Sequence, residues 1–226
     1  MIDLKANPFF LSDDDIRWVE ETLASMSVEE KIHQLFCLIT YTDDEECCKY
    51  IGQTVQPGGF MSRTMPPEQC ISATEKMQKY SKIPMLVAAN FEAGGNGMIV
   101  GGTVLGRPME VAATGEVEQA RRLGEVCGVE GASVGANWAF APIIDIDYNW
   151  RNPITNTRTF GSDPETVKEM GKAYVVEVQK HGLAASIKHF PGDGTDYRDQ
   201  HLITSVNSLS MEEWWENYGR VYKAVI

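Results

Sequence analysis

Short apolar runs alternate along this chain with longer segments in which apolar residues recur at helical spacing. Runs of this length, bounded by polar residues, predict buried strands. The five runs are HQLFCLIT, GGFMSR, IPMLVAAN, NWAFAPIIDID and LAASIKHF. Between them the pattern predicts helices over residues 44–51, 67–80, 117–131 and 163–180. Strands that alternate with helices indicate a parallel sheet with helices packed outside it, either an open doubly wound sheet or a (β/α)8 barrel.

Local signals mark the ends of several helices. An acidic N-cap at Asp13–Asp15 precedes the amphipathic segment IRWVEETLASM. Serine followed three residues later by glutamate is a capping box, and this pattern occurs at Ser27–Glu30 and at Ser210–Glu213. The sequence has no internal repeat and no linker rich in Pro, Gly or Ser, so we expect one domain over residues 1–226.

Composition excludes several classes of function. The 226 residues are 43% hydrophobic and 23% charged, as in globular proteins that bury a core. Thirty-two acidic against twenty basic residues give a net charge of −12, which repels nucleic acid. No apolar run approaches the roughly 20 residues that span a bilayer, and the N-terminus lacks the features of a secretion signal. We therefore expect no nucleic-acid or membrane partner and a cytoplasmic location.

The cysteines and tryptophans have ordinary structural interpretations. Five cysteines without zinc-site spacing predict reduced, mostly buried thiols. They are Cys37, Cys47, Cys48, Cys70 and Cys127. We expect Trp214 or Trp215 to pack in the core.

Polar residues follow the predicted strands. They are Asn90 and Glu92 after the third strand, Asp145 and Asp147 at the end of the fourth, and Lys188 and His189 at the end of the fifth. The carboxyl ends of parallel strands meet at one edge of the sheet, where active sites of such folds lie. The glycine-rich segment NFEAGGNGM lacks the P-loop lysine and the GxGxxG spacing, so it predicts a tight turn near the substrate rather than a phosphate loop.

The loop GDGTDYRDQH concentrates ionisable residues. Asp199 and His201 are separated by one residue, which allows the carboxylate to bond one imidazole nitrogen while the other faces a substrate. The alternatives are solvated loop charges, or a metal site formed by His189, His201 and nearby aspartates, although the spacing matches no compact zinc motif. Arg158 could form a surface ion pair or a fork that grips ligand oxygens.

Four segments together resemble one family. NFEAGG, FAPIIDID, NPITNTRTFGSDP and KHFPGDGTDYRDQH resemble, in this order, the N-terminal part of glycoside hydrolase family 3, most closely its β-N-acetylglucosaminidase (β-hexosaminidase) branch, over about residues 27–226. The resemblance implies a TIM-like (β/α)8 barrel, incomplete here at about five β/α units, that hydrolyses β-glycosides with retention. It implies a small saccharide substrate and neither a cofactor nor a metal.

The resemblance also implies residue roles. Asp199 and His201 match an Asp–His pair that replaces the usual carboxylic acid/base: His201 would protonate the departing oxygen and then activate water, and Asp199 would orient it. The positions that would hold sugar hydroxyls correspond to Lys188, His189, Arg158 and Asn90. A neutral base also admits anionic phosphate as the acceptor, so phosphorolysis stays open.

Several positions depart from the family pattern. Asn90 replaces the usual aspartate, Ala93 interrupts the DxEGG motif, and Asp193 stands where histidine is common. An arginine that normally follows a few residues later has no counterpart near Met98. These departures leave the preferred sugar open.

The nucleophilic aspartate of the family follows the seventh strand, beyond the elements predicted here. We therefore expect a truncated domain that is nearly inactive alone, with a complementing C-terminal fragment or self-association covering its open sheet edges. Two rivals remain: a non-catalytic carbohydrate-binding or interaction protein on a degenerate barrel, and a metal-dependent TIM-barrel hydrolase.

Overall fold

The computed structural model describes residues 2–226, which contain one parallel sheet in the order β1–β2–β3–β4–β5. The strands are β1 (Cys37–Thr40), β2 (Gly59–Ser62), β3 (Leu86–Ala89), β4 (Trp138–Ala139) and β5 (Ala184–Ala185). Each strand pairs in parallel with the next in the sequence. This order confirms the barrel-type prediction, because a doubly wound sheet reverses its strand order at a switch point. Within residues 2–226, β1 and β5 remain at opposite edges, so the barrel is incomplete.

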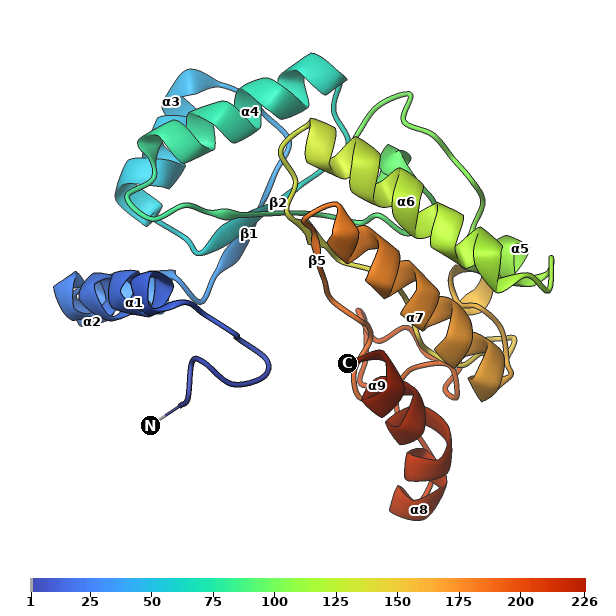
Figure 1. Cartoon of the computed structure of the whole chain (residues 1–226). Helices are drawn as coiled ribbons and strands as arrows, with labels where there is room; N and C mark the ends of the chain where they lie inside the picture. Colours follow the sequence, from blue (N-terminus) through green and yellow to red (C-terminus); the bar gives the residue numbers. More distant parts are fainter. Residues whose placement is uncertain (1) are drawn as a thin grey trace.

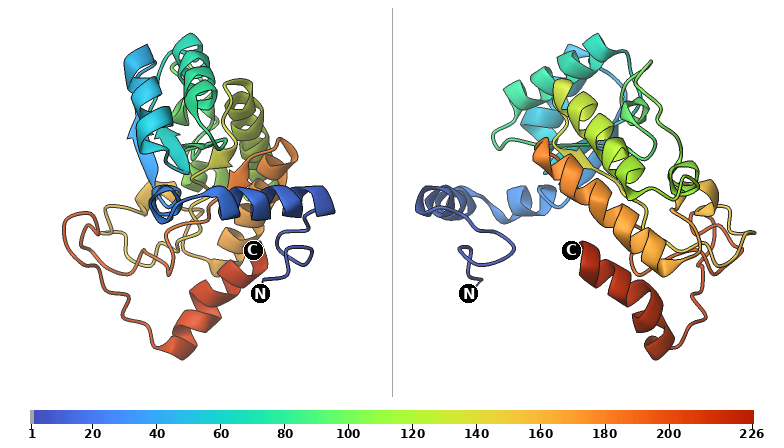
Figure 2. Two further views of the ribbon diagram at one scale, coloured as in Figure 1. Left: turned by 90° about the vertical axis from the view of Figure 1, so that its left-hand side faces the viewer. Right: turned by 45° about the vertical axis from the view of Figure 1, so that its right-hand side comes forward.

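Helices follow the strands and cover one side of the sheet. They are α1 (Asp13–Ser25), α2 (Val28–His33), α3 (Glu45–Tyr50), α4 (Pro67–Tyr80), α5 (Pro108–Ala112), α6 (Val117–Ser133), α7 (Pro164–Lys180), α8 (Met211–Trp214) and α9 (Arg220–Val225). Figure 1 shows α3, α4, α6 and α7 on the same side of the sheet, with α6 lying along α7. In Figure 2, α1 and α2 stand away from this layer, and neither buries any of its residues. No helix of residues 2–226 is long and apolar enough to cross a membrane.

The helix starts follow their sequence signals, with one shift. The capping boxes at Ser27–Glu30 and Ser210–Glu213 both form. The predicted N-cap at Asp13–Asp15 is wrong, because Ser12 is the N-cap and accepts a hydrogen bond from the Asp15 amide. The three aspartates instead form the first turn, where carboxylates stabilise a helix through its dipole.

Tertiary packing decides which thiols and indoles are buried. Cys48, Cys70 and Cys127 are buried as expected, whereas Cys37 is exposed on the edge strand β1. The prediction that one of the two tryptophans packs in the core is confirmed by Trp214, which packs against the core, whereas Trp215 is 54% exposed. The last helical segment buries Tyr218, Val221 and Tyr222 instead.

Strands β4 and β5 are shorter than their apolar runs predict. Pro142 interrupts the fourth run and has no N–H to donate to a strand ladder. Pairing resumes irregularly through a parallel bridge between Ile143 and Lys188, where the Ile144 amide donates to the Lys188 carbonyl at 2.9 Å. Lys188 and His189 therefore lie beyond the regular strand, and the alternation of faces that a strand imposes does not apply to them.

Candidate active site

The packed helices fix the chain at the carboxyl end of β3. The carbonyl of Phe91 accepts hydrogen bonds from the Tyr174 hydroxyl of α7 at 2.6 Å and from the Cys127 thiol of α6 at 3.3 Å. Phe91, Tyr174 and Cys127 are all buried. The backbone next to Glu92 is therefore held in place by the core.

Glu92 bonds two cationic side chains that lie far from it in the sequence, Arg158 and Lys188. Its carboxylate accepts from Arg158 Nε at 2.9 Å, from Arg158 Nη2 at 2.8 Å and from Lys188 Nζ at 2.7 Å. Lys188 Nζ also donates to Asn90 Oδ1 at 3.2 Å. We call Asn90, Glu92, Arg158 and Lys188 the Glu92 cluster. Of the two alternatives for Arg158, the structure shows an ion pair, but a half-buried one within this cluster rather than at the surface.

The cluster shifts the protonation equilibria of its members. Burial opposes ionisation of Glu92, but hydrogen bonds and charges from Arg158 and Lys188 outweigh it and lower its pKa to about 2. Burial lowers the pKa of Lys188, and the Glu92 carboxylate opposes that effect. The pKa of Arg158 is raised, chiefly by its hydrogen bonds to Glu92. The cluster therefore holds one carboxylate that is firmly ionised at neutral pH.

His189 is held beside the cluster by a buried carboxylate. Asp145 is fully buried, and its Oδ2 atom lies 2.5 Å from His189 Nδ1. Its Oδ1 atom accepts from the backbone amides of His189 at 3.0 Å and Asp193 at 2.8 Å. The carboxylate thus orients the ring through Nδ1, and Nε2 forms no hydrogen bond within residues 2–226.

Asp199 and His201 form the local pair that their spacing predicts. Asp199 Oδ1 lies 2.8 Å from both the His201 amide nitrogen and His201 Nδ1. The hydrogen bonds from the His201 amide and ring lower the pKa of Asp199. The His201 side chain is 68% exposed, and within residues 2–226 this pair forms no hydrogen bond with the Glu92 cluster. The structure therefore brings Asn90, Arg158 and Lys188 together but leaves the Asp–His pair on its own loop.

Buried polar residues fasten the base of that loop. Asp196 Oδ2 accepts from the Val206 amide at 2.6 Å, and both of its oxygens accept from the Arg198 guanidinium. Asn152 Nδ2 donates to the Asp196 carbonyl and to Asp193 Oδ1, each at 2.8 Å. Asp196 thereby joins the two ends of segment 197–205, which carries Asp199 and His201.

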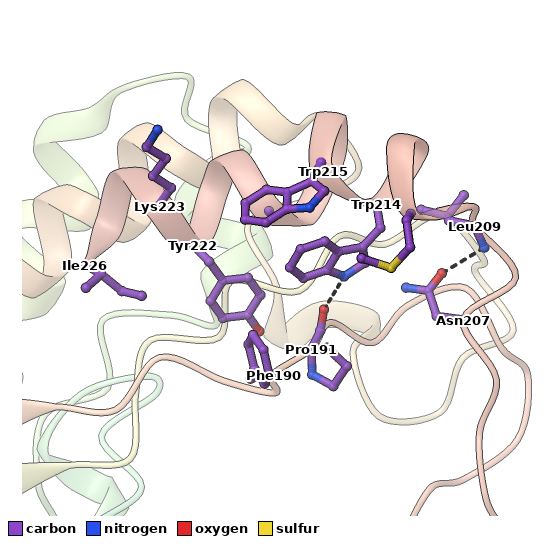
Figure 3. Close-up of a pocket in the computed structure, with 11 residues that line it drawn as sticks. Phe190, Pro191, Asn207, Leu209, Trp214, Trp215, Tyr222, Lys223 and Ile226 are labelled. Carbon is purple, nitrogen blue, oxygen red and sulfur yellow. Dashed lines mark hydrogen bonds between the residues drawn. The ribbon is translucent and has the colours of Figure 1, made fainter.

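Cavities of different character border this region. A polar cavity of about 490 Å³ is lined mainly by the segment after β3, with Asn90, Glu92, Asn96, Arg107, Glu110 and Arg158. A larger cavity of about 640 Å³, shown in Figure 3, has a mostly apolar lining that includes Phe190, Trp214, Tyr222 and Ile226. Trp214 Nε1 donates to the Pro191 carbonyl at its rim at 2.6 Å. Of these two cavities, the polar one is lined by members of the Glu92 cluster.

The cysteines, histidines and carboxylates of residues 2–226 form no group of three or more that could hold a metal ion.

The sequence indicated Glu92 at a strand end but did not predict it as the centre of a cluster, and it did not predict Asn96 and Arg107 as part of the site. The position of Glu92 after a strand was the available signal. Nothing in the local sequence marks Arg107, because a long loop separates it from β3.

Comparisons with known proteins agree on one family. Residues 27–226 match the N-terminal domain of glycosyl hydrolase family 3. A β-N-acetylglucosaminidase/β-glucosidase of Cellulomonas fimi is 51% identical over 226 residues, which are all of this chain and 40% of that protein. A β-hexosaminidase of Hydrogenovibrio crunogenus is 30% identical over 153 residues, covering 65% of this chain and 43% of its own length.

Solved structures give the same result. The structure of the β-glucoside phosphorylase BglX bound to 2FGlc matches with a TM-score of 0.93 and 49% identity, over 98% of this chain and 40% of that one. A family 3 β-N-acetylglucosaminidase of Paenibacillus matches in fold with a TM-score of 0.80 and 24% identity, over 89% of this chain and 40% of that one. The chain thus spans about two fifths of the length of these relatives.

Proposed function

The chain belongs to glycosyl hydrolase family 3, and from this membership we propose that it forms the sugar-holding, acid/base-carrying part of a retaining β-N-acetylhexosaminidase. The observation that carries the proposal is the Glu92 cluster, which lies at the carboxyl ends of the strands and borders a polar cavity. Lys188 and Asn90 present donors suited to sugar hydroxyls, and Arg158 holds Glu92 in place. His189, oriented by Asp145, would offer Nε2 to the same sugar.

Proton transfer is assigned to His201. An ionised Asp199 accepts from Nδ1–H, which leaves Nε2 to exchange a proton with the substrate. As imidazolium, His201 would give the Nε2 proton to the departing oxygen; as neutral imidazole, it would take a proton from the incoming water. Asp199 keeps the same tautomer in both steps and stabilises the positive ring.

We propose that the nucleophile lies outside residues 2–226. The two carboxylates that bond the predicted sugar contacts are already engaged, Glu92 by two cations and Asp145 by His189 and two backbone amides. An aspartate that attacks a sugar carbon needs a free oxygen on the open side of the sheet. We propose that further polypeptide supplies this aspartate and pairs with the free edges of β1 and β5.

Complementation tests this proposal. The purified chain should turn over 4-nitrophenyl β-N-acetylglucosaminide at no more than a trace rate. Addition of the part of the Cellulomonas fimi relative that lies beyond the matched region should restore turnover, and His201→Ala in this chain should abolish the restored rate. Full turnover by the chain alone would contradict the assignment of the nucleophile.

Phosphorolysis is the second candidate, favoured by the 49% identity to a structure named as a β-glucoside phosphorylase. A neutral acid/base repels a phosphate dianion less than a carboxylate does. The complemented protein should then release a glycosyl phosphate in phosphate buffer and free sugar in the absence of phosphate.

A non-catalytic sugar-binding role predicts instead that binding survives His201→Ala and that complementation yields no turnover. Comparison of the N-acetylglucosaminide with the glucoside identifies the preferred sugar.

A further inference from the structure

The polar cavity beside the Glu92 cluster contains two side chains to which the proposed reaction assigns no role. Asn96 lies in the loop after β3, and Arg107 directly precedes α5. An antiparallel bridge between Gly94 and Val104 folds this loop back on itself. As a result, Asn96 and Arg107 line the same cavity as Asn90, Glu92 and Arg158.

Asn96 carries a buried acceptor that the protein leaves unused. Its Oδ1 atom is buried and has no hydrogen-bond partner within residues 2–226. Buried acceptors are nearly always paired, because an unpaired one has lost its water without replacement. A donor of a ligand bound in the polar cavity that Asn96 lines would pair this acceptor.

Arg107 carries donors that the protein leaves unused. Its side chain forms no salt bridge within residues 2–226, in contrast to Arg158, whose guanidinium bonds Glu92 and the Ile154 carbonyl. Glu110, one of the two carboxylates in the lining, accepts from the Arg107 backbone amide at 2.6 Å. The guanidinium of Arg107 is therefore available to an oxygen in the cavity.

We propose that Asn96 and Arg107 form a specificity-determining contact for the hydroxyl groups of a neutral sugar. Asn96 Oδ1 accepts a hydrogen bond from one hydroxyl, and Arg107 donates to an oxygen of the same sugar. A hydroxyl both donates and accepts, so a sugar satisfies both residues. The ionised oxygens of a phosphate only accept, so they would leave Asn96 Oδ1 unpaired. This inference rests on the proposed function, because it places the sugar beside the Glu92 cluster.

The test measures sugar binding to the full chain by NMR titration with methyl β-N-acetylglucosaminide and methyl β-glucoside. Asn96→Ala and Arg107→Gln should each weaken binding of at least one glycoside by roughly 5- to 10-fold, as expected for loss of one hydrogen bond. The matched control is Arg17→Gln in α1, an exposed arginine paired with Asp14 away from the cavity, which should leave the affinity unchanged. Thermal unfolding of each variant verifies that it is folded.

The outcomes separate this inference from the proposed function. If Lys188→Ala weakens binding while Asn96→Ala and Arg107→Gln do not, the cluster holds the sugar and this inference is wrong. If neither glycoside binds the unaltered chain, both proposals fail. If inorganic phosphate binds, and that binding is lost in Arg107→Gln but retained or strengthened in Asn96→Ala, the cavity is an anion site and the inference is overturned.

Discussion

Replacement of Glu92 by glutamine tests the central feature of the site. The substitution keeps the shape of the side chain but leaves Arg158 and Lys188 half-buried without a counter-charge. Folding moves the pKa of Glu92 from its ordinary value of 4.5 to about 2, and each pKa unit corresponds to about 1.4 kcal/mol. The ionised carboxylate therefore stabilises the fold by about 3 kcal/mol, similar to the cost of removing one partner of a buried ion pair.

The measurement is urea unfolding of the unaltered chain and of Glu92→Gln across a pH series. Because the folded pKa is lowered, the stabilisation is fully present above about pH 4.5 and is lost as the pH falls toward 2. The difference between the two proteins should accordingly be about 3 kcal/mol at pH 6 and shrink steadily below pH 4.5. Adding Lys188→Met to Glu92→Gln should recover part of the loss, since it removes one uncompensated cation.

The matched control is Glu118→Gln on the surface of α6. Glu118 forms its ion pair with Arg121, but both side chains are well exposed. Such pairs contribute about 0–1 kcal/mol. A cost for Glu92→Gln no larger than that of the control, or a difference that does not change between pH 6 and pH 2, would refute the account of the cluster.

Two further substitutions probe the loop and the backbone around it. Asp196→Asn removes the charge that joins the ends of segment 197–205. Limited proteolysis should therefore cut this segment faster, while the overall unfolding midpoint changes little. An unchanged cutting rate would show that Asp196 does not hold the loop. Gly194→Ala places a Cβ atom against the Ile146 carbonyl at φ +110°, whereas Gly101→Ala at φ +79° meets no neighbour within 4 Å. Thermal unfolding should show a loss above about 2 kcal/mol for Gly194→Ala and about 1 kcal/mol for Gly101→Ala, and equal losses would contradict the close approach.

Local patterns predicted the elements where local forces determine them. Helix α4 begins at Pro67 and ends at Tyr80 as predicted, because proline suits the first turn and the apolar spacing continues to that point. The alternation of strands and helices predicted a parallel sheet, and the family resemblance decided between a barrel and a doubly wound sheet. The lengths of β4 and β5 could not be predicted, since an apolar run indicates burial and not a regular ladder.

Contacts within the site were less predictable the farther apart their residues lie in the sequence. The bond between Asp199 and His201 spans two residues and follows from spacing alone. The bonds of Glu92 to Arg158 and Lys188 span 66 and 96 residues, so only the tertiary fold brings them together. The rule that strand ends converge indicated the neighbourhood but not the partner, and it gave no information about Arg107, which follows a loop rather than a strand.

The chemistry of the proposed acid/base depends on short-range bonds, whereas its position relative to the sugar depends on long-range ones. Asp199 holds His201 through two bonds within one turn, so the pair keeps its tautomer wherever the loop lies. Asp196 and Asn152 fasten this loop at its base. A change at position 199 should therefore alter the pH dependence of proton transfer, whereas a change at position 196 should alter how often His201 reaches the sugar. In the complemented enzyme, Asp199→Asn should shift the pH–rate profile, and Asp196→Asn should lower the rate without moving that profile.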